Sequence, residues 1–538
     1  MFFTKNQKFC YFFANTYCVF TFFTIECASR FCQNLTKPKT KRCQNHIWQN
    51  LKGATMSKTP KQISFNAFEM NCISHLSPGL WRYPNDQALR YKDIEYWQTI
   101  AQNAEKGLFD AVFIADVIGV YDIYGGNDFG ALKTALQVPV NDPVQLAAVS
   151  AAATKHIGFG ITSGVPFEHP FPFARRLSTL DHLTKGRVGW NIVTGYLPSA
   201  NKNMGESELP HDERYEVADE YMEVIYKLLE GSWEDDAVIL DRETGDFANP
   251  SKIHHIGHHG KYFNVPGIHI CEPSIQRTPV LFQAGNSPRG RKFAATHAEG
   301  IFIAPPTKEY AKIAVKQVRD ALIQAGRDPY SAKIYLLATV ITDKTEELAQ
   351  AKYKDLLKYA STEGSLVINS GWLGVDLSRY ELDDPLSNIK SNAIVAQVEA
   401  LSNSTTDEGK TWTLRDLIKL TGIGCQGPKI IGSPQKVADI LQEFIAYSDA
   451  DGFNLAYATT PGTIQDVVEF VVPELQKRGA YKQEYTQGSL RHKLFGKGDR
   501  LDSSHIASQY RVGGPKSSID DYTGTGRSKA KKEVDYVI

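Results

Sequence analysis

The amino-acid sequence predicts an α/β protein whose core is a parallel (β/α)₈ barrel, the TIM-barrel fold. From residue 63 onward, short apolar runs alternate with longer amphipathic stretches. Eight such pairs follow one another, and a chain of 538 residues has room for so large a domain. A doubly wound open sheet is the alternative, but the number of units and the chain length favour the barrel.

Each apolar run is short and non-alternating, as expected for a strand that is buried on both faces. The expected strands are Ile63–Phe68, Ala111–Ala115, Ile157–Ile161, Val188–Val193, Pro279–Phe282, Gly300–Ile303, Ile334–Ile341 and Gly452–Ala456. The expected helices are Asp93–Lys106, Pro143–Lys155, Phe173–Leu183, Asp212–Glu230, Pro288–His297, Thr307–Ala325, Thr345–Tyr359, Pro434–Tyr447 and Thr463–Arg478.

Two insertions interrupt the predicted barrel, which spans residues 56–485. Residues 231–278 follow the fourth strand, and residues 360–432 follow the seventh. An insertion of the second length is typical of a lid or a binding loop. Residues 486–538 form a C-terminal extension, and its polar end, from Gly513 to Lys532, is expected to be disordered.

Composition excludes some functions. The 60 basic and 60 acidic side chains balance, so no electrostatic argument favours nucleic acid or an acidic membrane as partner. Five of the 8 cysteines lie in the first 43 residues, and no CxxC pair occurs. This usage argues against a disulfide framework and fits a reducing, cytoplasmic compartment.

Residues 1–55 differ from the rest and form a leader or a non-native extension. Phe9 to Ile25 is apolar and aromatic, and Lys5 and Lys8 precede it. This pattern leaves a signal sequence, a targeting peptide or a membrane anchor open. A start at Met56, or removal of the leader, is an equally good interpretation.

A candidate anion site lies at residues 282–291 (FQAGNSPRGR). A strand ends there, Gly285 makes the turn, Ser287 takes the N-cap and Pro288 the first helical position. The N–H groups and the positive end of a helix are a common way to hold a phosphate. The plainer interpretation is an ordinary capped helix.

Polar residues also follow the other strands. They are Glu69, Asn71, Asp116, Thr162, Ser163, Asn191 and Thr194. Because catalysis in such barrels takes place at the carboxyl ends of the strands, these residues indicate one shared polar ligand. His211 and Tyr215 lie one turn apart at the start of a helix, where they can reach the same phosphate or simply cap the helix.

Three further patterns are weaker. Residues 422–427 (GIGCQG) match GxGxxG but follow a helical stretch instead of a strand, which argues against a dinucleotide site. His254, His255, His258 and His259 lack a completing ligand, so no metal is expected. The pairs Glu168–His169 and Asp181–His182 are more typical of helix caps than of acid–base catalysis, and no Ser-His-Asp set can be assembled.

Dense local matches then point to a family. They are residues 66–72 (NAFEMNC), 79–82 (GLWR), 105–110 (EKGLFD), 140–143 (VNDP), 174–187 (ARRLSTLDHLTKGR), 190–194 (WNIVT), 211–215 (HDERY), 283–285 (QAG) and 451–455 (DGFNL). The chain resembles the flavin-dependent monooxygenases of the bacterial luciferase superfamily over roughly residues 60–510. The branch it resembles holds the long-chain alkane, nitrilotriacetate and dibenzothiophene-sulfone monooxygenases.

The resemblance implies a barrel that binds reduced FMN, with O₂ as co-substrate. It places flavin contacts on Asp116, Thr162, Ser163, Asn191, His211, Tyr215 and Ser287, with Ser287 and Tyr215 on the phosphate. It also suggests Cys72, His75 and Tyr121 as substrate-side, catalytic residues. Tyr196 is a departure, since the alkane-oxidising relatives carry a histidine there, and residues 412–433 look more like the nitrilotriacetate and sulfone-type relatives.

The implied reaction inserts one oxygen atom of O₂ into a small alkane, organosulfur or amine-type substrate through a flavin C4a-hydroperoxide. A separate NAD(P)H:FMN reductase would supply FMNH₂, and a homodimer or homotetramer is expected. Two alternatives stay open, namely a flavin carrier without oxygenase activity and a phosphate-binding barrel lyase or isomerase. The lyase would need a lysine or paired carboxylates at the strand ends, and no lysine occurs there.

Overall fold

The computed structural model describes residues 61–285, 287–389, 411–424 and 426–517. The predicted leader, residues 1–55, lies outside the described residues, as do residues 390–410 of the second insertion and the C-terminal end from residue 518. Among the residues described, no helix is both long and apolar enough to cross a membrane.

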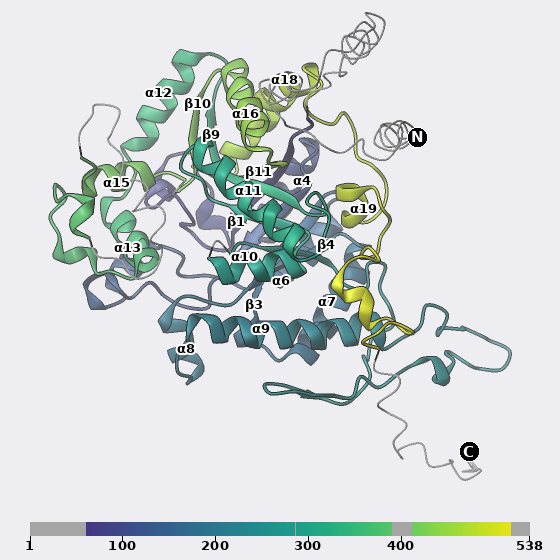
Figure 1. The fold of residues 1–538 in the computed structure, drawn as a ribbon. Coiled ribbons are helices and arrows are strands. Elements are labelled where there is room, and N and C mark those ends of the chain that lie inside the picture. The colour runs from purple at the N-terminus through teal and green to yellow at the C-terminus, as the bar shows by residue number, and fades with distance from the viewer. Residues whose placement is uncertain (1–60, 286, 390–410, 425, 518–538) are drawn as a thin grey trace, which may run out of the picture. The chain divides into compact units, whose positions relative to one another are not determined.

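The predicted parallel barrel is confirmed (Figure 1). Its eight strands are β1 (Ser64–Met70), β2 (Ala111–Ala115), β3 (Gly158–Gly164), β4 (Val188–Val193), β7 (Val280–Gln283), β8 (Gly300–Ile303), β9 (Lys333–Thr342) and β11 (Gly452–Ala456). They pair in the order β11-β1-β2-β3-β4-β7-β8, and β9 closes the ring by pairing with both β8 and β11. Closure brings the carboxyl ends of all these strands to one face.

The covering helices follow their strands as the pattern predicts. They are α4 (Ile94–Lys106), α6 (Pro143–Ala152), α7 (Pro170–Thr184), α9 (His211–Tyr226), α10 (Pro288–His297), α11 (Lys308–Gln324), α12 (Glu346–Leu357), α16 (Pro434–Ser448), α17 (Gly462–Asp466) and α18 (Val472–Lys477). The last expected helix is interrupted by a π-helical turn over Val467–Val471. Pro473, which has no N–H to donate to the preceding turn, follows directly and accounts for the irregularity.

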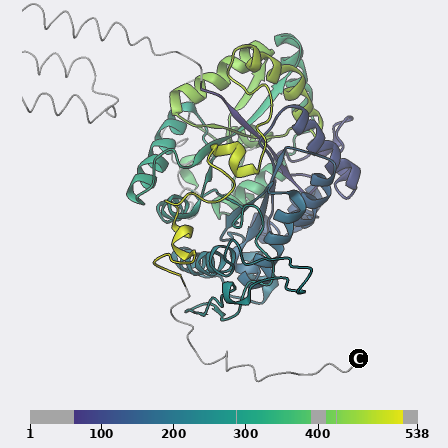
Figure 2. The ribbon, with the colours of Figure 1, turned by 90° about the vertical axis from the view of Figure 1, so that its right-hand side faces the viewer.

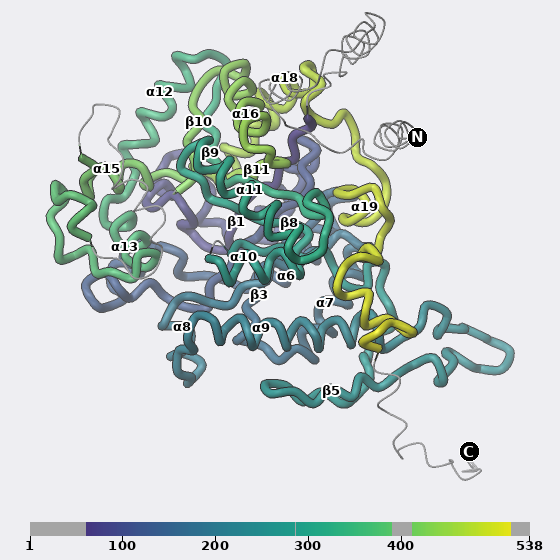
Figure 3. Tube along the Cα trace, viewed as in Figure 1, coloured from purple at the N-terminus to yellow at the C-terminus, as the bar shows by residue number. Residues whose placement is uncertain are grey.

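The first insertion runs along α9 and carries a small antiparallel pair, β5 (His258–His259) and β6 (Asn264–Val265) (Figure 3). Glu220 on α9 accepts hydrogen bonds from the backbone N–H groups of Tyr262 and Phe263, the latter at 2.7 Å. This segment therefore braces the outside of the barrel.

The second insertion contributes α13 (Thr362–Leu373), α15 (Leu414–Thr421) and one further strand, β10 (Lys429–Gly432). Strand β9 is ten residues long, so its last four residues, Thr339–Thr342, extend far enough to pair with β10 in parallel. The sequence did not predict β10 as a strand of the sheet. Its four residues are too few to show a reliable periodicity.

Short helices complete the two ends of the barrel. Helices α5 (Phe129–Thr134) and α8 (Pro198–Met204) belong to loops that follow β2 and β4. Helix α19 (Leu490–Phe495) lies against the amino ends of the strands, on the side that faces the viewer in Figure 2. There Leu490 and Leu494 join the aromatic side chains inside the barrel, including Phe113, Phe282 and Phe302.

A buried ion pair fastens α19 to the barrel. The Nε and Nη2 atoms of Arg491 donate to the two carboxylate oxygens of Glu299, at 2.7 and 2.8 Å. Arg491 also donates to the backbone carbonyl of Thr278. Burial by itself would raise the pKa of Glu299, but the charge of Arg491 outweighs it, so that pKa lies below its usual value. This ion pair thus fixes helix α19 to the barrel.

Removing the cation should test this attachment. We expect Arg491→Met to lower the free energy of unfolding by about 3–5 kcal/mol, because Glu299 would stay buried without a counter-charge. Arg415→Met is the matched control, since Arg415 and its partner Asp383 are both exposed and should contribute little. Denaturant unfolding of both variants gives the comparison, and equal losses would contradict the assignment.

Candidate active site

The N-terminus of α10 forms a compact cradle at the end of β7. Ser287 is the N-cap, and its hydroxyl accepts a hydrogen bond from the N–H of Gly290 at 3.0 Å. A Cβ on Gly285 would lie 2.9 Å from the Cα of Gly290 and 3.0 Å from the hydroxyl of Tyr215. The two glycines therefore let the backbone approach Tyr215 closely, as an anion site at a helix start requires.

Helix α9 adds two side chains to this cradle. The Nε2 atom of His211 lies 3.3 Å from the hydroxyl of Ser287, and the ring of His211 meets that of Tyr215 edge-on. Burial raises the pKa of Tyr215, while hydrogen bonds with Thr194 and Ser287 oppose the rise. Strand β4, helix α9 and helix α10 thus meet at one point, as the strand-end argument predicted.

A cation lies beside the cradle. The guanidinium of Arg289 stands 5.2 Å from the centre of the Tyr215 ring and pairs with Asp219 at 2.5 Å. The positive charge is therefore fixed on the outer side of Tyr215 and partly balanced.

Strands β3 and β4 place two predicted residues side by side. The amide nitrogen of Asn191 donates to the hydroxyl of Thr162 at 3.0 Å, and both side chains are buried. The amide oxygen of Asn191 is buried without a hydrogen-bond partner. Ser163 contributes differently, since its backbone carbonyl accepts from the indole of Trp190 at 3.1 Å.

Asp116 follows β2 at the same face. Burial raises the pKa of its carboxyl to about 7, and the nearby carboxylate of Asp142 acts in the same direction. The carboxyl of Asp116 therefore changes charge near neutral pH.

Cys72 and His75 lie in the loop after β1, and both are buried. Burial lowers the pKa of His75 to about 3, so its ring is neutral at pH 7, and its Nδ1 atom has no hydrogen-bond partner. Burial raises the pKa of Cys72, so the thiol keeps its proton. Both residues act at neutral pH as uncharged groups.

Tyr121 and Tyr196 form a hydrogen-bonded pair, with their hydroxyl oxygens 2.5 Å apart. Tyr121 is 1% exposed, whereas Tyr196 is 45% exposed. The Tyr121 hydroxyl also donates to Gln137 at 3.4 Å, and the amide of Gln137 donates to the backbone carbonyl of His75 at 3.1 Å. The His75 ring itself packs edge-on against Phe68, so its link with the tyrosine pair runs through its backbone.

A small cavity of about 70 Å³ lies beside these residues. Its lining is mostly apolar and comes from the loops after β2, β3 and β4. It consists of Asp116, Val117, Ile118, Gly164, Phe167, Val193, Gly195, Tyr196, Leu197 and Ala200. The space is on the order of two water molecules, which suits a ligand of a few heavy atoms.

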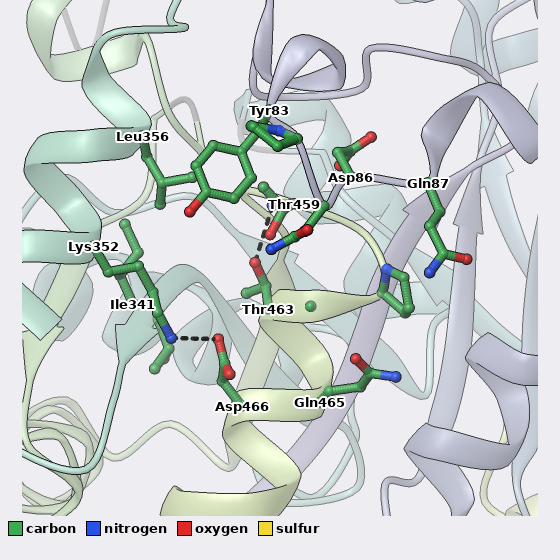
Figure 4. Close-up of a pocket in the computed structure, with 15 residues that line it drawn as sticks. Tyr83, Asp86, Gln87, Ile341, Lys352, Leu356, Thr459, Thr463, Gln465 and Asp466 are labelled. Carbon is green, nitrogen blue, oxygen red and sulfur yellow. Dashed lines mark hydrogen bonds and ion pairs between the residues drawn. The ribbon is translucent and has the colours of Figure 1, made fainter. Parts of the chain in front are cut away.

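A larger pocket of about 580 Å³ lies on the flank of the barrel (Figure 4). There Lys352 pairs with Asp466 at 3.1 Å, and the backbone N–H of Thr459 donates to Thr463. None of the predicted site residues lines it, so size alone does not mark the candidate site in this fold.

The weaker patterns have structural explanations. His254 and His258 contact Glu234 and Glu220, and no described group of three His, Cys, Asp or Glu side chains could hold a metal. The GxGxxG match lies between helix α15 and strand β10. The phosphate-binding fingerprint needs the reverse order, a strand and then a helix.

Sequence reasoning missed one residue of the candidate site, Gln137, and the role of another, Gly290. Gln137 connects Tyr121 with the loop of His75, but it follows no predicted strand, and its positive φ of 50° gives no signal in a sequence. Gly290 lies inside a helix, where a glycine is usually only a weak point.

A family comparison decides what this site belongs to. The family model described as luciferase-like monooxygenase matches residues 70–450. The chain belongs to the luciferase-like monooxygenases. The family resemblance read from the sequence is therefore confirmed.

Individual relatives of this luciferase-like monooxygenase are close. The dimethyl-sulfide monooxygenase of Hyphomicrobium sulfonivorans is 52% identical over 86% of the chain and 97% of the relative. The long-chain alkane monooxygenase of Geobacillus thermodenitrificans is 48% identical over 84% of the chain and 98% of the relative. The crystal structure of DmoA from Hyphomicrobium sulfonivorans matches with a TM-score of 0.80 at 51% identity, over 87% of this chain and all of that one.

These matches confirm the predicted enzyme class. The luciferase-like monooxygenase is a flavin-dependent enzyme of the FMNH₂-dependent, two-component kind. Members of this family use FMNH₂ and O₂, and a two-component enzyme implies a flavin reductase as partner.

A carboxylate placed at the cradle should exclude a phosphate. We expect Ser287→Asp to abolish binding of reduced FMN, because the new charge would occupy the anion site. Ser433→Asp is the matched control, since Ser433 caps α16 in the same Ser-Pro arrangement. Anaerobic flavin titration measures both, and affinity retained within a factor of about two in Ser287→Asp would remove the cradle from consideration.

The pKa of Asp116, about 7, predicts that the affinity for flavin depends on pH. A neutral carboxyl tolerates an anionic ligand better than a carboxylate does, so affinity for reduced FMN should fall as the pH rises through about 7. Asp116→Asn should lose this dependence. Asp142→Asn keeps the α6 cap, since Asn is a good N-cap residue, and should move the transition to lower pH by removing a neighbouring charge. Identical pH profiles for all three proteins would rule out Asp116 as the titrating group.

Proposed function

We propose that this monooxygenase binds FMNH₂ at the cradle and transfers one oxygen atom of O₂ to a small thioether. The observation that carries the substrate class is the cavity of about 70 Å³ between Asp116 and Tyr196. A thioether of a few heavy atoms fits such a space, whereas a long alkane would extend beyond it. The 52% identity with a dimethyl-sulfide monooxygenase, over nearly its full length, supports the same class.

Phosphate binding would rest on the chain's own donors. At the start of α10 the Ser287 hydroxyl, which accepts from the N–H of Gly290, lies beside His211 and hydrogen-bonds with Tyr215. A phosphate there would receive several hydrogen bonds from backbone and side chains at once.

The ring system would extend from the cradle along the ends of β4, β3 and β2. The unpartnered amide oxygen of Asn191 is a buried acceptor, and leaving such a group unsatisfied costs about 1–3 kcal/mol. The isoalloxazine edge carries N–H groups that would satisfy it. Thr162 holds the Asn191 amide in place, and Asp116 would lie at the far end, beside the cavity.

When bound, reduced flavin supplies the two electrons with which one atom of O₂ enters the substrate and the other leaves as water. The chain's part is to position the substrate and exclude water. His75 and Cys72 are uncharged at neutral pH, and Tyr196, which shares a hydrogen bond with Tyr121, lines the cavity. A polar substrate would have few partners in such a lining.

The test supplies NADH, FMN and a generic NAD(P)H:FMN reductase, and follows oxygenated product. We expect dimethyl sulfide to be consumed with stoichiometric NADH, and long alkanes to be consumed slowly or not at all. The chain without reductase should not oxidise NADH. Flavin binding with only H₂O₂ as product, for every thioether offered, would favour a flavin carrier instead.

We expect Tyr196 to limit the chain length of the substrates that the enzyme accepts. We expect Tyr196→His to shift preference toward longer substrates, because a smaller ring replaces the phenol at the cavity and the hydroxyl bond to Tyr121 is lost. Affinity for reduced FMN should stay about the same. The measurement is kcat/KM across a series of sulfides and alkanes, and coincident profiles would exclude Tyr196 as the selector.

A further inference from the structure

Helix α13 reaches the mouth of the barrel through contacts that only glycines permit. A Cβ on Gly364 would lie 2.6 Å from the Cβ of Pro78, and one on Gly130 of α5 would lie 2.6 Å from a methyl of Val367. A Cβ on Gly371 would overlap the ring of Tyr121. Nearly every residue of α13 between Gly364 and Leu373 is buried, so the helix has little room to move away.

The contact at Gly371 differs from the other two because Tyr121 leads to the cavity. Tyr121 is buried in one apolar cluster with Val367 and Ile368 of α13 and with Leu197 and Ala200. The last two side chains also line the cavity. The Tyr121 hydroxyl is 2.5 Å from the hydroxyl of Tyr196. Tyr196 lines the same cavity and is 45% exposed.

We propose that Gly371 is a positioning residue for substrate size. The absence of a side chain at Gly371 lets one edge of the Tyr121 ring lie close against α13. This contact places the Tyr121 hydroxyl where it holds Tyr196 across the cavity. Gly371 therefore acts through two tyrosines and does not touch the substrate. The inference rests on the proposed thioether oxygenation, which it deepens by naming what limits the substrate.

The physical reason is that a hydrogen bond tolerates a change of only a few tenths of an ångström in the distance between donor and acceptor. A methyl at position 371 must displace the Tyr121 ring, since helix α13 is enclosed on several sides. The hydroxyls would then separate beyond hydrogen-bond distance. Tyr196, half exposed, would lose the restraint that the Tyr121 hydroxyl places on it, and larger molecules would enter.

Gly371→Ala tests this inference, and Gly364→Ala is the control. Both changes add one methyl to α13 at a tight contact, so general effects on helix and packing are matched, but Gly364 faces Pro78 instead of Tyr121. We expect kcat/KM for dipropyl sulfide relative to dimethyl sulfide to rise about tenfold in Gly371→Ala. In Gly364→Ala the ratio should stay as in the unchanged enzyme, and flavin affinity should be the same in both.

Tyr121→Phe gives a second route that leaves α13 undisturbed. It removes the hydroxyl bond to Tyr196, so the same shift in preference should appear even if Gly371→Ala fails to fold. Calorimetric binding of both sulfides to the enzyme with oxidised FMN supplies a readout that does not depend on turnover. The larger sulfide should gain affinity in Gly371→Ala and Tyr121→Phe.

The inference is overturned if Gly371→Ala and Gly364→Ala give the same sulfide profile, because Gly371 would then matter only for helix packing. An unchanged profile in Tyr121→Phe overturns it as well. If the unchanged enzyme binds and oxidises no sulfide, the proposed substrate fails instead. In that case a crystal structure of Gly371→Ala tests the role of Gly371. If the hydroxyls of Tyr121 and Tyr196 are still within hydrogen-bond distance in that variant, the inference is refuted.

Discussion

Closure of the parallel sheet is the constraint on which the remainder of the structure depends. Strand β9 hydrogen-bonds to β8 on one side and to β11 on the other, which leaves no open edge in the barrel. Because all these strands are parallel, closure gathers their carboxyl ends into one ring. Asp116, Thr162 and Asn191 lie at the ends of three successive strands, β2, β3 and β4, which the parallel pairing places side by side within this ring.

The two ends of the barrel are finished in different ways. At the amino end, Leu490 and Leu494 of α19 fill the space below the aromatic core, and the Arg491–Glu299 pair fixes the helix there. At the carboxyl end, α13 approaches closely but leaves the small cavity between Asp116 and Tyr196. The first end contributes to stability, and the second leaves room for chemistry.

Charge at the candidate site is set mainly by burial. His75 is neutral, Cys72 keeps its proton, and Asp116 titrates near pH 7, all because burial disfavours the charged form. The cation of Arg289 and the N-terminus of α10 lie at the other end of the site. An elongated ligand with an anionic phosphate and an uncharged ring would match this distribution, and the proposed FMNH₂ site uses it.

The sequence alone determined the fold class, the order of the elements and most of the candidate residues. Apolar runs and the Ser-Pro helix start are local patterns, and each is visible within about ten residues. The family motifs around Asn66, His211 and Gln283 pointed to the flavin-dependent class for the same reason, since they too are contiguous.

Only the tertiary structure decided which of these residues meet. Tyr121 and Tyr196 are 75 residues apart and share a hydrogen bond, and Gln137 and Gly371 show their importance only through the packing of distant loops. Strand β10 likewise exists because β9 projects beyond the barrel and offers it a partner. Such contacts depend on distances across the closed barrel, which no local pattern in the chain encodes.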